Sequence, residues 1–337
     1  MTAGDQFDCA VVGTCVADIL VRPVPLATPV GGGRLFHVGP IEVTTGGIVC
    51  NTGLGLARLG LPVAAASLVG DDPWGSLIRE RLIAGGIDTA MLEAAPALAT
   101  STTAVLIDPS GERSFAHHVG ACGVIDLAWI RRQLPFLAHA RWVVLGYAGL
   151  LPALEPDLAA TVTLVRETGC RVALETGGAG GRLADVAPAL PGVDLYVPSL
   201  DEAAAQTGCE DPRAIIRRYR ELGAAGIVGV KLGSLGTLLS PTPGEFREVP
   251  CIAAPGPVID TTGAGDALLA GLLAGLIRGM SPPEACLLGA AHAACCVTAA
   301  GATAGLRSFD ATLHLSLGRN AGHVARNAGE DHDECGA

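Results

Sequence analysis

Short apolar runs separated by longer amphipathic stretches follow one another along most of the chain. The run at residues 8–13 ends in a glycine and predicts a buried strand. Further strands are predicted at residues 63–69, 142–145, 171–174, 195–197 and 226–230. Helices are expected between them, including residues 50–60 and 74–84. This alternation predicts an α/β fold with a doubly wound, mainly parallel sheet flanked by helices.

Two stretches do not fit the alternation. Residues 19–45 combine alternating positions with Pro and Gly, which is typical of edge strands and loops. Residues 102–107 and 113–118 flank an Asp-Pro-Ser-Gly turn and predict a hairpin. We therefore expect a small separate β-sheet from segments at about 19–45 and 96–122 of a domain covering residues 1–317. The polar residues 318–337 are expected to be a disordered tail.

Composition and charge narrow the function classes. The 337 residues are 50% hydrophobic but only 4% aromatic, so Ala, Val, Leu and Gly must build most of the core. The net charge is −11 and no dense basic patch occurs, which argues against a nucleic-acid partner. A phosphate-bearing ligand would therefore depend on a local set of backbone donors.

Two further features indicate a cytoplasmic protein without a membrane span. The eleven cysteines are scattered without metal-type spacing, which is typical of reduced thiols. Residues 285–306 lack Asp, Glu, Lys and Arg, but they are rich in Ala and Gly and contain His292. The preceding Ser281-Pro-Pro-Glu284 predicts a capping box, so we interpret this stretch as a core helix with His292 packed inside it.

The strongest local signal for chemistry is Asp260-Thr-Thr-Gly-Ala-Gly-Asp266, which runs directly into an apolar helix. The backbone N–H groups of Gly263, Ala264 and Gly265 would point out of the helix start and could bind a phosphoryl group. Asp266 in the first turn could accept a proton from an attacking hydroxyl. The alternative is an ordinary first turn with an acidic residue that the helix dipole favours.

Two weaker signals carry alternatives of their own. Gly46-Gly47-Ile-Val-Cys-Asn51 lets the backbone approach a ligand closely and brings an amide to a helix start, but it also fits a capped helix after a turn. Lys231-Leu-Gly-Ser-Leu-Gly236 follows an apolar strand and could cover a nucleotide. The alternative is an ordinary hairpin turn, which would have the same sequence pattern. It is not a Walker A loop, because the Gly-Lys-[Ser/Thr] ending is missing.

The three signals together, in this order, resemble the PfkB (ribokinase-like) family of carbohydrate kinases over roughly residues 8–310. Residues 260–266 are similar to the second signature of that family, and residues 46–60 to the first. Smaller similarities occur at residues 69–75, 108–115 and 197–203.

The resemblance implies an enzyme that transfers a phosphoryl group from ATP, with Mg²⁺, to a hydroxyl or hydroxymethyl group of a sugar or nucleoside. It implies Asp266 as the catalytic base and an anion hole at Gly263, Ala264 and Gly265. The implied substrate contacts are Asp18, which follows the first strand, and Gly46, Gly47 and Asn51. The implied nucleotide contacts are Ser199, Lys231, Gly233, Ser234 and Gly236. Metal contacts are implied at Glu202, for Mg²⁺, and at Asp260 and Thr262, which match a monovalent-cation (K⁺) site of many members.

The small β-sheet would be a lid over the acceptor, and the resemblance also implies a homodimer through this lid. We expect one of His117 and His118 to face the substrate and the other to face solvent, because neighbours in a strand point to opposite faces. Three positions depart from the family pattern: Ser199 stands for Asn, Ile48 for the Lys of ribokinases proper, and Cys122 for a common Asn.

Two alternative functions stay open on this fold. One is a kinase for a vitamin-like acceptor, and the other is a ligand-binding regulator without turnover. A dinucleotide-dependent dehydrogenase is disfavoured, since no Gly-x-Gly-x-x-Gly follows the first strand.

Overall fold

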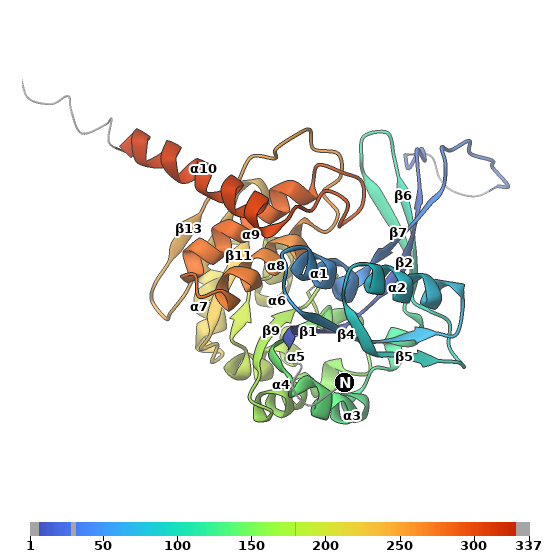
Figure 1. Cartoon of the computed structure of the whole chain (residues 1–337), viewed down its shortest axis with the longest axis horizontal. Coiled ribbons are helices and arrows are strands. Elements are labelled where there is room, and N and C mark those ends of the chain that lie inside the picture. The colour runs from blue at the N-terminus through green and yellow to red at the C-terminus, as the bar shows by residue number, and fades with distance from the viewer. Residues whose placement is uncertain (1–6, 28–31, 179, 328–337) are drawn as a thin grey trace, which may run out of the picture.

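The computed structural model describes residues 7–27, 32–178 and 180–327, and it contains two sheets (Figure 1). The large sheet has nine strands in the order β13-β12-β11-β10-β9-β8-β1-β4-β5. Its strands are β1 (Phe7–Gly13), β4 (Val63–Gly70), β5 (Asp88–Ala95), β8 (Ala140–Gly146), β9 (Arg171–Glu175), β10 (Leu195–Tyr196), β11 (Ile227–Lys231), β12 (Thr237–Ser240) and β13 (Arg247–Val249). All neighbours from β11 to β5 pair in parallel, which confirms the predicted fold class.

Both edges of the large sheet extend beyond the predicted strands. The antiparallel β12 and β13 continue it past β11, and β5 pairs in parallel with β4. These strands were missed because none offers a long apolar run: β12 and β13 have only 4 and 3 residues, and β5 has just two adjacent buried residues, Met91 and Leu92. The large-sheet strands that the sequence did predict are those with mostly buried residues.

Helices cover both faces of the large sheet (Figure 1). The helices are α1 (Gly47–Arg58), α2 (Pro73–Ala84), α3 (Leu127–Leu137), α4 (Leu158–Glu167), α5 (Leu183–Val186), α6 (Leu200–Thr207), α7 (Pro212–Glu221), α8 (Ala264–Ile277), α9 (Pro282–Cys296) and α10 (Phe309–Asn327). Helix α8 packs closely on α1 and α9. A Cβ added to Gly271 of α8 would lie only 2.6 Å from Gly289 Cα of α9, so small residues allow this close packing.

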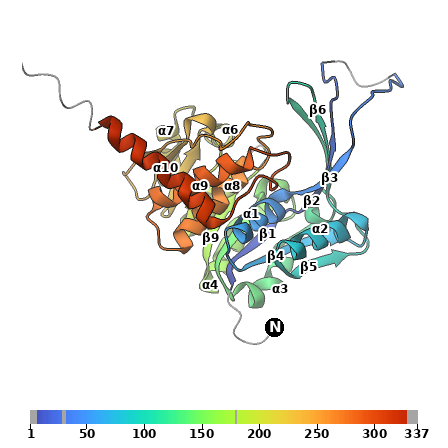
Figure 2. The same ribbon diagram turned by 45° about the horizontal axis from the view of Figure 1, so that its top comes forward.

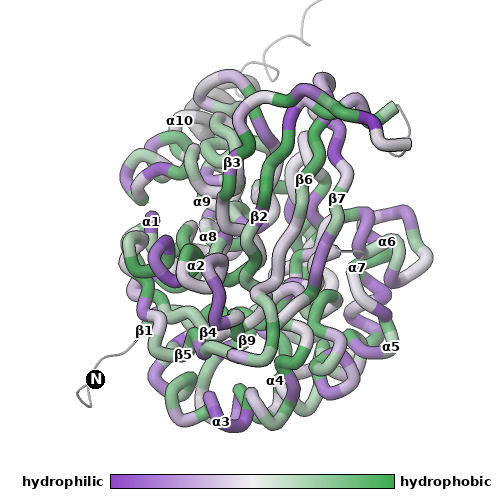
Figure 3. The backbone as a smooth tube through the Cα atoms, turned by 90° about the vertical axis from the view of Figure 1, so that its right-hand side faces the viewer, coloured by the Kyte–Doolittle hydropathy of each residue, from purple (hydrophilic) through white to green (hydrophobic). Residues whose placement is uncertain are grey.

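The second sheet stands apart from the large one and has the order β3-β2-β6-β7 (Figure 2). Its strands are β2 (Val16–Val21), β3 (Glu42–Gly46), β6 (Thr102–Ile107) and β7 (Arg113–His118). The predicted hairpin of β6 and β7 is confirmed, with register from Thr102↔His118 to Ile107↔Arg113. Figure 3 shows the four strands side by side, with hydrophobic stretches along β2 and β6. We call this sheet the lid.

Three expectations need correction. Asp18 comes after the first strand, as expected, but it lies within β2 of the lid and not at the carboxyl edge of the large sheet, because the chain changes sheets at residues 14–15. Helix α1 begins at Gly47 rather than at residue 50. The segment from residue 318 is not wholly disordered, since α10 extends to Asn327, and residues 328–337 lie outside the described part of the chain.

The charge-free segment 285–306 is a core helix only in its first part. Helix α9 ends at Cys296, and residues 297–306 form turns and bends instead of helix. Ser281 and Glu284 form the expected capping box at the start of α9, and its His292 is fully buried. No described helix combines the length and apolar character needed to cross a bilayer.

Candidate active site

A cavity of 740 Å³ lies between the lid and the carboxyl ends of the large-sheet strands. Ligands of doubly wound sheets bind at this edge. Of the residues implied from the sequence, those that line the cavity are Asp18, Gly47, Asn51, Ser199, Glu202, Lys231, Gly233, Asp260, Thr262, Gly263, Ala264, Gly265 and Asp266. Gly46, Ser234 and Gly236 are not part of the wall: the first two are chain neighbours of lining residues, and the Gly236 N–H donates to Gly233 O at 3.1 Å. Segments far apart in the sequence thus meet at one site.

Asp266 lies in the first turn of α8 and is only 5% exposed. Its Oδ2 accepts hydrogen bonds from Asn51 Nδ2 at 2.9 Å and from the Tyr147 hydroxyl at 2.7 Å. Burial raises the pKa of Asp266 above its usual value, although these two hydrogen bonds and the charge of Lys231 oppose the shift. The result is a carboxylate of fixed orientation with more basicity than a solvated aspartate, which suits a general base.

The turn before Asp266 has the backbone that an anion site needs. Gly263 is the N-cap of α8 with φ of +75°, a left-handed conformation that favours glycine. A Cβ at this position would also collide with Ala302. The N–H of Ala264 makes only a long bond of 3.3 Å to Thr261 O, so it can turn to a stronger acceptor. An oxyanion here would lie on the positive end of a 14-residue helix.

Asp18 lines the cavity from the lid side. It pairs with Thr44 of β3 and Thr103 of β6 in the lid register, and both threonines also line the cavity. Burial raises the pKa of Asp18 to about 6, while a hydrogen bond from Thr103 opposes the shift. A carboxylate between two hydroxyl-bearing neighbours offers several acceptors and donors to a polyol.

Gly46 leaves room for the Asp18 carboxylate, and its backbone conformation does not itself require a glycine. Its φ of −136° is open to any residue, but a Cβ there would collide with the Asp18 carboxylate. We expect Gly46→Ala to displace that carboxylate and to raise the acceptor KM by about tenfold, the scale of one lost hydrogen bond to a charged group, with little change in the KM for ATP.

Gly256→Ala is the matched control, because a Cβ there would meet only Thr298 at an ordinary 3.8 Å. Steady-state kinetics of both variants test the assignment. An acceptor KM for Gly46→Ala equal to that of Gly256→Ala would show that Gly46 does not position Asp18.

A buried ion pair joins two strand ends on the far side of the cavity. Lys231 Nζ lies 3.0 Å from Glu175 Oε2, and the two side chains are 12% and 4% exposed. Burial raises the pKa of Glu175 to about 7, with the Lys231 charge opposing the shift, and the pair keeps the pKa of Lys231 above its usual value. A Cβ on Gly265 would lie 3.3 Å from Nζ, so this ammonium stands beside the start of α8 and adds positive charge there.

Ser199, which replaces the Asn of the family pattern, is the N-cap of α6. Its backbone N–H and its hydroxyl each donate to Glu202 Oε2 at 2.7 Å, forming a capping box. Glu202 is 9% exposed and lines the cavity. Mg²⁺ is commonly held by one or two carboxylates together with water and nucleotide phosphates, so a single fixed carboxylate fits such an ion.

Three residues that sequence reasoning missed bind predicted site residues directly: Tyr147 bonds Asp266, Glu175 pairs with Lys231, and Arg113 pairs with Asp260. Tyr147 follows β8 and is left-handed (φ 55°, ψ 43°). A Cβ on Gly177 would collide with its ring, so the glycine makes room for the tyrosine. The position of Tyr147 and Glu175 at strand ends was an available signal. No local sequence pattern identifies Arg113 as a site residue, because its partner Asp260 lies 147 positions further along the chain.

The histidines differ in their surroundings. His117 Nδ1 lies 2.9 Å from Thr103 Oγ1 and lines the cavity, whereas His118 is not among the lining residues. Burial lowers the pKa of His292 to about 4, so this histidine is a neutral core residue.

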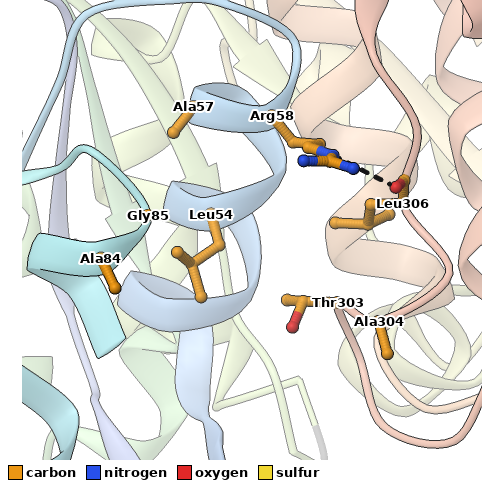
Figure 4. Close-up of a pocket in the computed structure, with 8 residues that line it drawn as sticks. All are labelled: Leu54, Ala57, Arg58, Ala84, Gly85, Thr303, Ala304 and Leu306. Atoms are coloured by element: carbon orange, nitrogen blue, oxygen red, sulfur yellow. Dashed lines mark hydrogen bonds between the residues drawn. The ribbon is translucent and has the colours of Figure 1, made fainter. Parts of the chain in front are cut away.

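A second hollow of 490 Å³ lies between α1, the end of α2 and the loop before α10 (Figure 4). Arg58 Nε donates to Leu306 O at 3.4 Å across it. The remaining lining residues are Leu54, Ala57, Ala84, Gly85, Thr303 and Ala304. These residues include no carboxylate, histidine or thiol, so the larger cavity is the candidate active site.

A buried carboxylate beside a glycine-rich helix start, beneath a β-sheet lid, is an arrangement that suits phosphoryl transfer to an alcohol. The pfkB family carbohydrate kinase model matches residues 6–308. The chain therefore belongs to the PfkB family of carbohydrate kinases.

Individual proteins agree with this assignment. The chain is 30% identical to a fructokinase of Klebsiella pneumoniae over 79% of this chain and 83% of the relative. It is 28% identical to a ribokinase of Haemophilus influenzae over 81% of this chain and 88% of the relative.

Solved structures show the same fold. Arabidopsis thaliana ribokinase, complexed with ribose and ATP, has a TM-score of 0.80 at 24% identity and covers 93% of this chain and 99% of its own. An Escherichia coli protein solved with ATP and Mg²⁺ has a TM-score of 0.77 at 21% identity, with the same coverage.

Proposed function

We propose that this kinase transfers the γ-phosphoryl group of ATP to a hydroxyl, of the hydroxymethyl type, on a sugar or nucleoside. The observation that carries the proposal is the buried Asp266 at the start of α8, oriented by Asn51 and Tyr147 inside a cavity that both sheets enclose. Asp266 is the base, and the turn at residues 263–265 is the anion hole.

In this mechanism the acceptor lies between the lid and α1. Asp18 accepts hydrogen bonds from its hydroxyls, and Asn51 adds an amide at the start of α1. The reacting hydroxyl points at Asp266, which takes its proton while the acceptor oxygen attacks the γ-phosphorus in line with the leaving ADP oxygen. Backbone N–H groups of residues 263–265 hold the equatorial oxygens of the transferred group.

The nucleotide lies on the other side of the anion hole. Lys231 faces the phosphates with its ammonium, and the turn from Gly233 through Ser234 to Gly236 covers the base and ribose. Glu202, fixed by Ser199, would hold Mg²⁺, which neutralises phosphate charge when bound. The lid excludes water from the acceptor side. We also propose that two lids pair in a homodimer, as the family resemblance implies.

A coupled ADP-release assay over hexoses, pentoses, nucleosides and hydroxymethyl vitamins tests the function. We expect ADP release with a sugar or nucleoside well above the rate without acceptor, and a phosphate monoester in the product by mass spectrometry. ADP release with a vitamin alone would identify the protein as a kinase for a vitamin-like acceptor instead of a sugar or nucleoside. A protein that binds ATP and acceptor without releasing ADP would be a ligand-binding regulator.

Acceptor binding should weaken as the pH falls below about 6. In the free enzyme the Asp18 carboxyl takes up a proton there, and a neutral carboxyl loses the charge-assisted hydrogen bonds to hydroxyls. Calorimetric Kd values for the acceptor across this range test the effect. The dependence should disappear in Asp18→Asn; a wild-type Kd that is flat through this range would contradict the placement of Asp18 against the acceptor.

A further inference from the structure

Arg113 connects the lid to the loop that precedes the anion hole. It is the first residue of β7, and its Nη2 lies 2.5 Å from Asp260 Oδ1, while Nη1 lies 3.4 Å from Thr261 Oγ1. The side chains of Arg113 and Asp260 are 21% and 7% exposed. The two residues are 147 positions apart, so this ion pair forms only when the lid stands over the cavity as it does here.

Asp260 in turn joins the two loops beside the anion hole. Its Oδ1 accepts from the Thr262 N–H at 2.9 Å, and its Oδ2 accepts from the Gly301 N–H at 2.9 Å. Gly263, the N-cap of α8, packs against Ala302 so closely that a Cβ would collide. A partner that holds the Asp260 carboxylate in place therefore also holds the two backbone segments next to Gly263: the one at Thr262 and the one at Gly301 and Ala302.

The carboxylate pairs with the Arg113 guanidinium and accepts from the N–H groups of Gly301 and Thr262, and its side chain is only 7% exposed. An ionised carboxylate with so little exposure is costly unless it is paired.

The guanidinium already fills the place that the family resemblance gives to a monovalent cation. Oδ1 is occupied by Arg113 and the Thr262 N–H, and Oδ2 by the Gly301 N–H. A second cation on the same carboxylate would stand beside the guanidinium and be repelled by it. With the lid in this position, the residues present do not fit a bound K⁺ at Asp260.

We propose that Arg113 is a positioning residue that brings to Asp260, from the lid, the positive charge that orders the anion-hole loops, so that turnover does not require added K⁺. This inference rests on the proposed kinase function. The guanidinium is docked whenever the lid stands over the cavity, and opening the lid leaves Asp260 unpaired; an enclosed acceptor favours the closed lid. An enclosed acceptor therefore favours an ordered anion hole. In this way acceptor binding is coupled to phosphoryl transfer.

The activity test compares Arg113→Gln with Arg22→Gln in K⁺ and in tetramethylammonium chloride at equal ionic strength. Arg22 is the matched control, because it also forms a lid ion pair, 2.7 Å to Glu42, but that pair is exposed. We expect wild type and Arg22→Gln to have the same kcat/KM in both salts. Arg113→Gln should lose about tenfold in tetramethylammonium, the scale of one charged hydrogen bond, and recover in K⁺, which can now reach Asp260.

A second measurement does not need a known acceptor. Hydrogen exchange of the Thr262 and Gly301 amides, which Asp260 protects, should be faster in Arg113→Gln than in Arg22→Gln. If wild type phosphorylates no acceptor, the kinase proposal fails while this measurement still judges the ion pair.

Three results would overturn the inference. They are K⁺ activation of wild type, Arg113→Gln behaving like Arg22→Gln in both assays, and a loss in Arg113→Gln that K⁺ does not restore.

Discussion

Replacing Asp266 with asparagine is expected to lower kcat by about 10²- to 10⁴-fold, the usual loss when a general base is removed. Asparagine keeps the size of the side chain, and its amide oxygen can still accept from Asn51 and Tyr147. The variant therefore retains the geometry at the start of α8 but lacks an oxygen that can take up the proton of the acceptor.

Binding should change little in the same variant. Lys231 keeps its ion pair with Glu175 when the buried charge of Asp266 is removed. We expect the ATP Kd to stay near the wild-type value, so that the loss lies in kcat. Steady-state kinetics with the acceptor found in the screen, together with calorimetric titration of ATP, separate these quantities.

Asp126→Asn is the matched control for this experiment. Asp126 is the N-cap of α3, where it accepts from the Trp129 N–H at 2.7 Å, and it does not line the cavity. Asparagine is an equally good N-cap, so this variant should have wild-type kinetics. If Asp266→Asn turned over as fast as Asp126→Asn, Asp266 would not be the base.

The sequence predicts best those parts of the site that depend on backbone and on neighbouring residues. Gly263 to Asp266 form one continuous turn and helix start, and the chemistry of that turn can be inferred without knowing what packs around it. Gly46, Gly47 and Asn51 are similar, because a glycine pair before a helix limits what the backbone can do. For the same reason the buried strands were predicted, since their apolar runs are local.

What the sequence could not supply are pairings between distant elements. Tyr147 reaches Asp266 over 119 positions, and Lys231 reaches Glu175 over 56. Each of these side chains is ordinary in its own segment, and its role arises only from the order of strands in the sheet.

The misplacement of Asp18 has the same origin. Residues 8–13 and 16–21 are separated only by Thr14 and Cys15. The sequence placed the start of the small sheet at about residue 19, just after Asp18, and nothing local shows that the strand already begins at Val16. A change of sheet within two residues is decided by partners that come later in the chain, β3 and β6.

The corrected position of Asp18 leads to the second large effect. Asp18→Ala should weaken acceptor binding by about 1.5–3 kcal/mol, or about 10- to 150-fold, the scale for hydrogen bonds to a charged group. Because Asp18 is on the lid and the nucleotide turn is on the large sheet, the ATP Kd should be unchanged. Calorimetric titration of each ligand measures the two affinities separately.

The thermal stability of this variant distinguishes lost binding from lost folding. The pKa of Asp18 is about 6 in the folded protein against a usual value of 3.8, so the folded state binds more protons than the unfolded state between these values. Stability therefore falls as the pH rises through this window, and above it the ionised Asp18 opposes folding. Asp18→Ala should keep or raise the Tm of the ligand-free enzyme at neutral pH.

Glu42→Ala is the matched control, since Glu42 is a lid carboxylate on β3 that is half-exposed and outside the cavity wall. Its acceptor affinity should equal that of wild type. If Asp18→Ala bound the acceptor as tightly as Glu42→Ala, the carboxylate would not hold the hydroxyls. The apolar cavity residues of the same strands, Val16 and Leu20 on β2 and Val105 and Ile107 on β6, would then be the main lid contacts, and the acceptor would be less polar than a polyol.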